Sequence, residues 1–405
     1  MNRTVILTLI AGLWGLAGCG APPAGPTPTP EGAGPRNLPT LVAPPWTESA
    51  GPVDLATIQN IAYLGRLDLP ERPSTIFAVA VSPDGTRLAG LNAEELLAWD
   101  LLTGELVFRT ARAEATRIFY APDKTELYAL SIDGQLNVVD AETGAVVNRL
   151  AAHTAYSGSF SFDGLNNRLA LGGDDGTVKV WDLFERQSLV TIDAHDGRIT
   201  ALAFGPEGDQ LVTGGGDRTV AVWDWAARAA LATLTLDAVI AAQVAVAPDG
   251  AQIAVGTETD AILWAVAADT TQSLTIGGTD GATQILAYAP DGGVLMAGGR
   301  TVGLSLWNPA TAELIGRLPD MTGERLSATF SPDGDLLLTA VFGEQVALWN
   351  LVDSTADALS QAALSLGTAE ISDVYWTADG RLLLFFDAAG PIYVWGIGPT
   401  PTPMP

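Results

Sequence analysis

Cysteine and histidine are almost absent from this chain of 405 residues, which contains one cysteine, Cys19, and two histidines. One cysteine cannot form a disulfide within a single chain, so stability has to come from packing and from closure of the fold. The two histidines are not paired in sequence, no second cysteine is present, and no twelve-residue calcium loop occurs. We therefore expect neither a metal site nor a cofactor.

Basic residues are also scarce. The chain has 20 Lys and Arg against 46 Asp and Glu, which gives a formal net charge of −26. A surface of this charge repels the phosphate backbone of nucleic acids, which excludes nucleic acid as an expected partner. It offers no electrostatic attraction to anionic lipid headgroups either. We expect any partner to be a protein, of unspecified identity, and the chain itself to be a monomer.

The single cysteine follows a short apolar run near the start of the chain. Arg3 precedes the twelve-residue run VILTLIAGLWGL at 5–16, which is too short to span a bilayer and suits a signal peptide. The run ends in LAGC at 16–19, which resembles the lipobox of bacterial lipoproteins. That resemblance implies loss of residues 1–18 and a diacylglycerol on Cys19. We therefore expect a membrane-anchored, extracytoplasmic protein on the periplasmic or cell-surface side.

Proline-rich chain brackets the rest of the sequence. Ten prolines lie between Gly20 and Pro52, and the last seven residues read PTPTPMP. Such composition favours extended, solvated chain over a packed core. We expect residues 19–54 to form a disordered linker after the lipidated cysteine, residues 55–398 to fold, and residues 399–405 to be a disordered tail.

Between the proline-rich tracts the sequence repeats eight times. A turn signal such as SPDG (82–85) or APDG (247–250) recurs with its acidic residue 39 to 46 residues from the next. About 15–20 residues after each turn an apolar stretch ends in Trp or Val, usually followed by Asp or Asn, as in VKVWD (178–182) and VAVWD (220–224). In the turn, proline presets φ and glycine takes the positive φ.

This spacing and the Trp-Asp ending resemble the WD-repeat β-propeller family. The resemblance implies an all-β fold of four-stranded blades closed into a ring. Eight turns and eight Trp-type strands predict eight blades, with seven blades plus an irregular segment as the alternative. The last repeat lacks a fourth strand and the first is preceded by a surplus one, IAYLGRL (61–67). The resemblance therefore implies that this N-terminal strand completes the last blade.

One repeat carries all four residue types of the family's structural tetrad. His195, Thr213, Asp217 and Trp223 occupy the matching positions, and the resemblance implies a buried hydrogen-bond network among them. His153 belongs to a partial copy in the preceding repeat, in which Leu171 replaces the hydroxyl. A Thr-His-Asp set also permits a catalytic triad, but each member falls at a structural position, so we expect no catalytic residue.

The remaining candidates are contacts for a partner. In WD-repeat propellers, partners dock on the loops that join blades and on the turns between second and third strands. Those segments include Arg112, Arg117, Arg198, Arg218 and Arg300, and arginine is enriched at binding hot spots. Trp225 lies outside the tryptophan pattern and is predicted to be an exposed contact.

We expect a non-enzymatic protein-protein interaction scaffold. The alternative is a solute-sensing protein or a hydrolytic enzyme working at the central channel, for which no set of catalytic residues can be assembled from the sequence.

Overall fold

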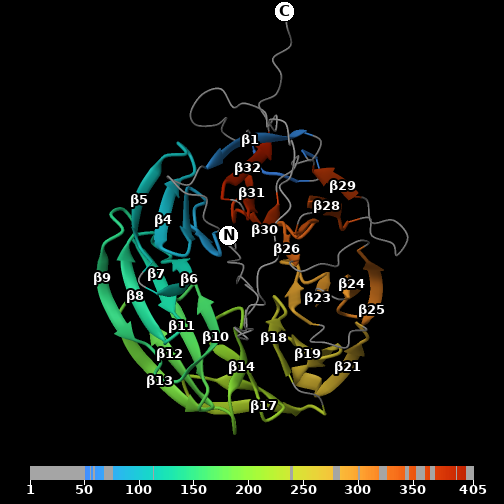
Figure 1. Cartoon of the computed structure of the whole chain (residues 1–405). Coiled ribbons are helices and arrows are strands. Elements are labelled where there is room, and N and C mark those ends of the chain that lie inside the picture. The colour runs from blue at the N-terminus through green and yellow to red at the C-terminus, as the bar shows by residue number, and fades with distance from the viewer. Residues whose placement is uncertain are drawn as a thin grey trace, which may run out of the picture.

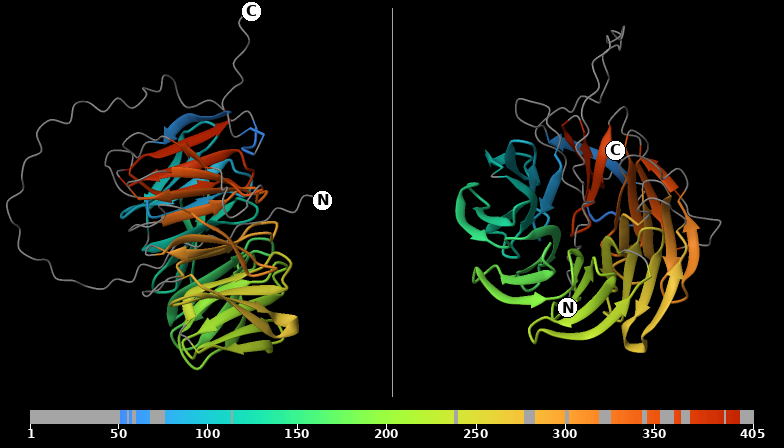
Figure 2. Two further views of the ribbon diagram at one scale, coloured as in Figure 1. Left: turned by 90° about the vertical axis from the view of Figure 1, so that its right-hand side faces the viewer. Right: turned by 60° about the horizontal axis from the view of Figure 1, so that its bottom comes forward.

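The computed structural model describes residues 51–54, 56–57, 60–67, 76–112, 114–237, 240–276, 283–299, 302–318, 326–342, 346–352, 361–364, 370–388 and 390–397. These residues form eight four-stranded antiparallel sheets and one short 3-10 helix, η2 (Val266–Ala268). Figures 1 and 2 show that successive sheets follow one another around a ring. The chain is an all-β, eight-bladed β-propeller, as the eight repeats predicted.

Each blade contains four consecutive strands, except the last. The first four blades are formed by β2 (Ala78–Val81), β3 (Arg87–Leu91), β4 (Glu95–Asp100) and β5 (Leu106–Ala111); β6 (Ala115–Tyr120), β7 (Glu126–Ser131), β8 (Gln135–Asp140) and β9 (Val146–Ala151); β10 (Tyr156–Asp163), β11 (Arg168–Gly173), β12 (Thr177–Asp182) and β13 (Gln187–Asp193); and β14 (Ile199–Phe204), β15 (Gln210–Gly215), β16 (Thr219–Asp224) and β17 (Ala229–Thr235). The next three are formed by β18 (Ile240–Val246), β19 (Gln252–Thr257), β20 (Ala261–Ala265) and β21 (Thr270–Leu274); β22 (Ile285–Tyr288), β23 (Leu295–Gly299), β24 (Gly303–Asn308) and β25 (Glu313–Arg317); and β26 (Leu326–Phe330), β27 (Leu336–Val341), β28 (Val346–Asn350) and β29 (Gln361–Leu364).

The eighth blade joins the two ends of the described chain. It combines β30 (Ile371–Trp376), β31 (Leu382–Asp387) and β32 (Ile392–Ile397) with β1 (Ile61–Leu67), in the order β1-β32-β31-β30. The register runs from Ile61 opposite Ile397 to Leu67 opposite Ile392. The N-terminal strand thus supplies the missing outer strand, and the ring is closed by sheet hydrogen bonds rather than by a disulfide.

The hydrophobic core lies between the blades. Buried side chains form eight clusters, and each cluster joins two adjacent sheets. The cluster that closes the ring combines Leu64 of β1 and Val394 of β32 with Leu88 and Trp99 of the first blade. A single sheet of this kind would leave both faces exposed to water, so every blade depends on its two neighbours for burial.

Antiparallel strands place the loops of each blade on two faces of the ring. The turns between the first and second strands and between the third and fourth strands lie at one end, which we call the turn face. The turns between the second and third strands and the connections between blades lie at the other end, which we call the connector face. The PDG-type turns are on the turn face, where Gly85 adopts φ 72° and Lys124 adopts φ 64° in the corresponding position of the second blade.

Where a Trp-type strand ends in aspartate or asparagine, that side chain organises the following turn. The Asp100 carboxylate accepts hydrogen bonds from the backbone N–H groups of Leu102 and Thr103, both at 2.9 Å. Asp140 and Asn308 accept equivalent bonds in their own blades. The Asp or Asn of the repeat is therefore a turn-forming residue of the kind whose side chain replaces a backbone acceptor.

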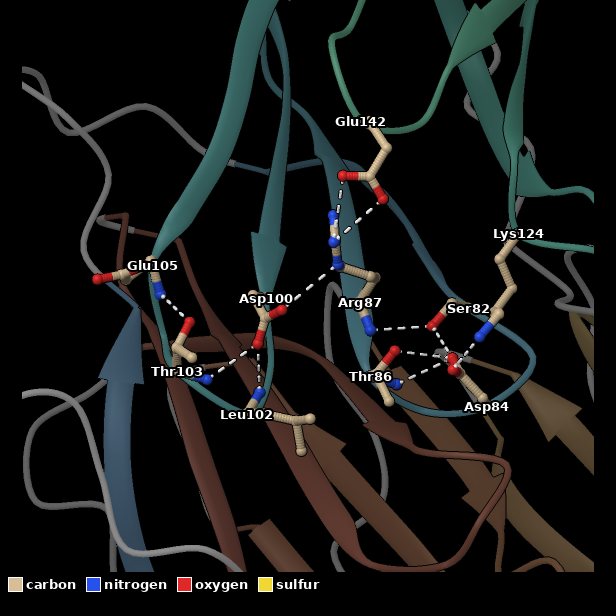
Figure 3. Close-up of polar contacts among 10 residues, drawn as sticks. All are labelled: Ser82, Asp84, Thr86, Arg87, Asp100, Leu102, Thr103, Glu105, Lys124 and Glu142. Carbon is tan, nitrogen blue, oxygen red and sulfur yellow. Dashed lines mark hydrogen bonds and ion pairs between the residues drawn. The ribbon is translucent and has the colours of Figure 1, made fainter.

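Charged pairs tie the first blade to the second on the turn face (Figure 3). The Lys124 ammonium contacts Asp84 at 2.5 Å, and the Arg87 guanidinium reaches Glu142 at 3.2 Å as well as Asp100 of its own blade at 3.5 Å. Burial would raise the pKa of Asp84, but hydrogen bonds from Lys124, Ser82 and Thr86 outweigh it and hold that pKa well below its usual range. Two acidic residues of these turns, Asp84 and Glu142, thus form ion pairs between adjacent blades.

Candidate functional site

His195, Asp217, Thr213 and Trp223 form one buried network in the fourth blade. Asp217 lies at 3.1 Å from Nδ1 of His195, and the Thr213 hydroxyl lies at 2.6 Å from Nε2. The Trp223 indole N–H donates to that same hydroxyl at 3.0 Å. Every group is satisfied if Nδ1–H donates to Asp217 and Nε2 accepts from Thr213.

The histidine and the threonine of this network are shielded from solvent. The side chain of His195 has no exposed surface and Thr213 is 0% exposed, so no substrate can reach the hydroxyl. Partial burial would raise the pKa of Asp217, but hydrogen bonds from the Thr219 hydroxyl and N–H and from the Asp196 N–H lower it below its usual value. The carboxylate therefore remains an ionised acceptor that orients the imidazole.

The third blade carries an incomplete version of this network. His153 is 1% exposed, and its Nε2 lies at 3.3 Å from the Thr177 hydroxyl, which also donates to Asp175 at 2.7 Å. Leu171 offers no acceptor, and the Trp181 indole N–H donates instead to the backbone oxygen of Ala152 at 2.9 Å. Burial lowers the pKa of His153, so this imidazole is neutral in the folded protein at pH 7.

A second hydroxyl-indole pair is present that the sequence reasoning missed. In the seventh blade the Trp349 indole N–H donates to the Thr339 hydroxyl at 2.9 Å, and both side chains are buried. The signal was available, because Thr339 precedes its tryptophan by ten residues, as Thr213 does. In the sixth and eighth blades, the Nε1 atoms of Trp307 and Trp395 are buried with no hydrogen-bond partner among the described residues.

Three of the arginines named from the sequence lie on connector-face loops. Arg112 follows β5 in the connection between the first and second blades, and Arg198 precedes β14 in the connection between the third and fourth blades. Arg218 lies in the turn between β15 and β16 with φ 67°. Arg198 pairs with Asp174 at 3.3 Å, with both side chains more than half exposed. The Arg112 guanidinium lies 5.5 Å from the ring centroid of Phe77, an aromatic side chain that is 42% exposed and was not singled out from the sequence.

Two of the predicted contacts occupy other places. Arg117 lies within β6, the first strand of its blade, and not on a loop; its Nη1 donates to the Thr116 oxygen at 2.9 Å and burial lowers its pKa. Trp225 was expected to be exposed, and this was wrong, because its ring is only 6% exposed. Its indole N–H donates to the Gly208 oxygen at 2.9 Å and its ring packs against the Arg168 guanidinium.

Several predictions from the sequence concern residues outside the described ranges. They include Cys19 with the signal peptide and most of the proline-rich linker, the tail from 399 onwards, and Arg300. Within the described ranges, no group of three or more His, Cys, Asp or Glu side chains could hold a metal ion. No helix in those ranges has the length and hydropathy needed to cross a bilayer.

Comparison with known proteins gives matches to parts of the chain. Residues 144–182 and 186–224 match the family model described as WD domain, G-beta repeat. Protein groucho of Drosophila melanogaster is 30% identical over 141 residues, which are 34% of this chain and 19% of that protein. Transducin-like enhancer protein 2 of Mus musculus is 29% identical over 131 residues, 31% of this chain and 17% of that protein. The chain therefore covers less than a fifth of either relative.

A solved structure matches over most of the chain. The crystal structure of the computationally designed Ika8 protein superposes with a TM-score of 0.64 at 22% identity, covering 82% of this chain and 99% of Ika8. At that identity the likeness shows the fold alone. The two matched repeats and the relatives support the WD-repeat propeller family for this eight-bladed ring.

Proposed function

We propose that the chain is a lipid-anchored, extracytoplasmic scaffold, without enzymatic activity, whose connector face binds a protein partner. WD-repeat propellers are typically protein-protein interaction scaffolds, which supports the class. The choice of the connector face as the binding surface rests on the Arg112-Phe77 pair. An exposed aromatic ring beside an arginine has the composition of a binding hot spot. Arg198 and Arg218 lie on the same face in other blades of an acidic chain.

The buried state of the Thr-His-Asp set supports the non-enzymatic part of the proposal. A hydrolase at the channel would need a nucleophile, base or metal that substrate can reach. In the fourth-blade set the threonine that would have to act as nucleophile, Thr213, is 0% exposed. We propose that the set fixes the connection between β13 and β14, which carries Arg198, and so preorganises the binding surface.

The partner test is crosslinking in intact cells. A photo-crosslinking residue at Phe77 is expected to trap one protein, and the reversal Arg198→Glu with Arg218→Glu is expected to abolish that adduct. The matched control, Arg149→Glu with Arg228→Glu, makes the same charge change at exposed residues away from the connector face. An adduct that survives the connector-face reversal and disappears in the control would refute this face as the binding surface.

The anchor is tested separately. Cys19→Ser removes the thiol that would carry the lipid, and we expect the variant to move from the membrane to the soluble fraction and to lose labelling by a radioactive fatty acid. The wild-type chain is the matched control in both measurements. A Cys19→Ser chain that still fractionates with membranes would overturn the lipid anchor without affecting the scaffold proposal.

A further inference from the structure

A second surface, distinct from the connector face, lies on the turn face where the third and fourth blades meet. A hollow of about 400 Å³ opens there, lined by Arg168 of the third blade and by Asp209, Asp224, Trp225 and Leu231 of the fourth. Its fourth-blade residues come mainly from the turn between β14 and β15 and from the turn between β16 and β17. The repeat has an unusual residue at this junction.

The unusual residue is the one that follows the aspartate of the Trp-type strand. In the first, third and seventh blades this position holds Leu101, Leu183 and Leu351, which are at most 6% exposed and fill the space between blades. In the fourth blade it holds Trp225, whose indole N–H is fixed to the Gly208 oxygen at 2.9 Å. The larger ring is part of the lining of the hollow.

Arg168 also behaves differently from its counterpart in the first blade. Arg87 forms ion pairs with Asp100 and Glu142, whereas Arg168 makes no ion pair among the described residues. Its guanidinium stands 4.9 Å from the Trp225 ring centroid and donates to the Gly208 oxygen at 3.3 Å. Asp163 and Asp182 are the cross-strand neighbours of Arg168 in its sheet. Arg168 is therefore a fixed wall of the hollow.

The rim carries carboxylates that the fold does not use fully. Asp209 is exposed and makes no hydrogen bond or ion pair with any described residue. Asp224 uses Oδ1 to accept from the Ala227 N–H at 2.8 Å, which leaves the rest of its carboxylate free for another donor. Beneath them lie the Trp225 ring and Leu231, which is 54% exposed.

Large apolar side chains continue on the same face of the adjoining blade. Phe184, in the turn between β12 and β13, is 74% exposed, and Leu165, in the turn between β10 and β11, is 62% exposed. Exposed apolar groups on the same face as a polar-rimmed hollow are typical of a protein interaction site. Phe184 has the highest exposure among the large apolar side chains of the described residues.

We propose that this hollow binds a lysine or arginine side chain of an extended protein segment, with Phe184 and Leu165 contacting its apolar neighbours. The methylene stem of such a residue would pack on Trp225 and Leu231 while its cationic head meets Asp209 and Asp224. Charge complementarity selects this occupant. A second copy of this chain, at −26, would be repelled, as would an anionic ligand. The proposal does not depend on the connector face or on the lipid anchor.

The test uses the full-length chain purified in detergent and two defined probes. One probe is the acetylated and amidated pentapeptide Leu-Ser-Arg-Ser-Leu. The other replaces arginine by citrulline, which keeps the shape and removes the charge. We expect the arginine peptide to bind at least about tenfold more tightly by calorimetry, with an affinity that falls as salt rises. Binding should also shift the ¹⁹F resonance of Trp225 in chain labelled with 5-fluorotryptophan.

Variants locate the binding. Asp209→Asn with Asp224→Asn is expected to weaken arginine-peptide binding about tenfold, and Leu231→Ser about threefold or more. The matched control, Asp237→Asn with Glu258→Gln, removes the same charge from exposed connector-face residues and should change the affinity less than about twofold.

Equal binding of the citrulline peptide, or equal loss in the two double variants, would overturn the proposal. So would concentration-dependent dimerisation abolished by Leu231→Ser in a chain that binds neither peptide, because that result assigns the surface to a second copy.

Discussion

Thr213→Val is the sharpest perturbation of the buried network, because valine has nearly the volume of threonine and lacks only the hydroxyl. The substitution leaves the Trp223 indole N–H and Nε2 of His195 without their partner in a site from which water is excluded. Each buried polar group left unsatisfied costs about 1–3 kcal/mol. Two such groups are left, so we expect the free energy of unfolding to fall by about 2–6 kcal/mol.

The seventh blade supplies a matched comparison. There the Thr339 hydroxyl accepts from Trp349, and no histidine is involved, so Thr339→Val leaves one indole N–H unsatisfied and should cost about 1–3 kcal/mol. The difference between the two variants isolates the contribution of His195. Thr213→Ser keeps the hydroxyl and should recover most of the loss.

The assay is urea unfolding of the full chain, followed by tryptophan fluorescence and by circular dichroism, with coincident transitions as the check for two-state behaviour. Equal losses in Thr213→Val and Thr339→Val would show that the histidine contributes nothing beyond the indole contact. A loss under about 1 kcal/mol in Thr213→Val would refute the unsatisfied-group reasoning as a whole.

Three further predictions follow from buried contacts. Ala297→Ser places a hydroxyl at the position of Thr213 in the sixth blade, where it can accept from Trp307, and should raise the free energy of unfolding by about 1 kcal/mol in the same urea assay. Burial depresses the pKa of His153 below its unfolded value of about 6.5. The contribution of neutral His153 to stability is therefore complete above pH 6.5 and is lost as the pH falls through the folded pKa. His153→Gln should flatten the plot of unfolding free energy against pH measured between pH 7.5 and pH 5. Gly176→Ala puts a Cβ 2.1 Å from the His195 oxygen in addition to the strain of its positive φ, whereas Gly292→Ala meets nothing closer than 3.5 Å, so Gly176→Ala should lower the melting temperature by clearly more.

The repeat pattern predicted the ring well because its signals act within one blade. A turn sequence such as SPDG and a strand such as VAVWD need only their own hydrogen bonds to form, and eight of each specify eight sheets. Closure by residues 61–67 followed from counting, since the last repeat lacked an outer strand and β1 supplies it. The positions in the His195 network follow from the same register.

The errors concern contacts between blades. Trp225 was predicted to be exposed because it interrupts the tryptophan pattern, yet its position in the repeat is the buried one held by Leu101 in the first blade. Aligning the repeats by register would have found this. Arg117 was placed on a loop because β6 begins earlier than the apolar run suggests, at Ala115, with a register shift between the two residues. The exposure of Phe77 depends on the packing of the folded ring. Its residue type alone would predict burial, so the sequence did not indicate an exposed side chain.

The positions of the chain ends give the two faces different surroundings. The Val53 N–H donates to the Gly380 oxygen at 2.8 Å in a turn-face turn of the eighth blade, and Ile61 pairs with Ile397 where β1 begins and β32 ends. The segments that precede residue 51 and follow residue 397 are thus joined to the ring on its turn face. Figure 1 shows this blade across the ring from β14 and β17, so these attachments lie away from the hollow beside Trp225. The connector face, with Arg112 and Phe77, lies at the other end of the strands from these two attachment points.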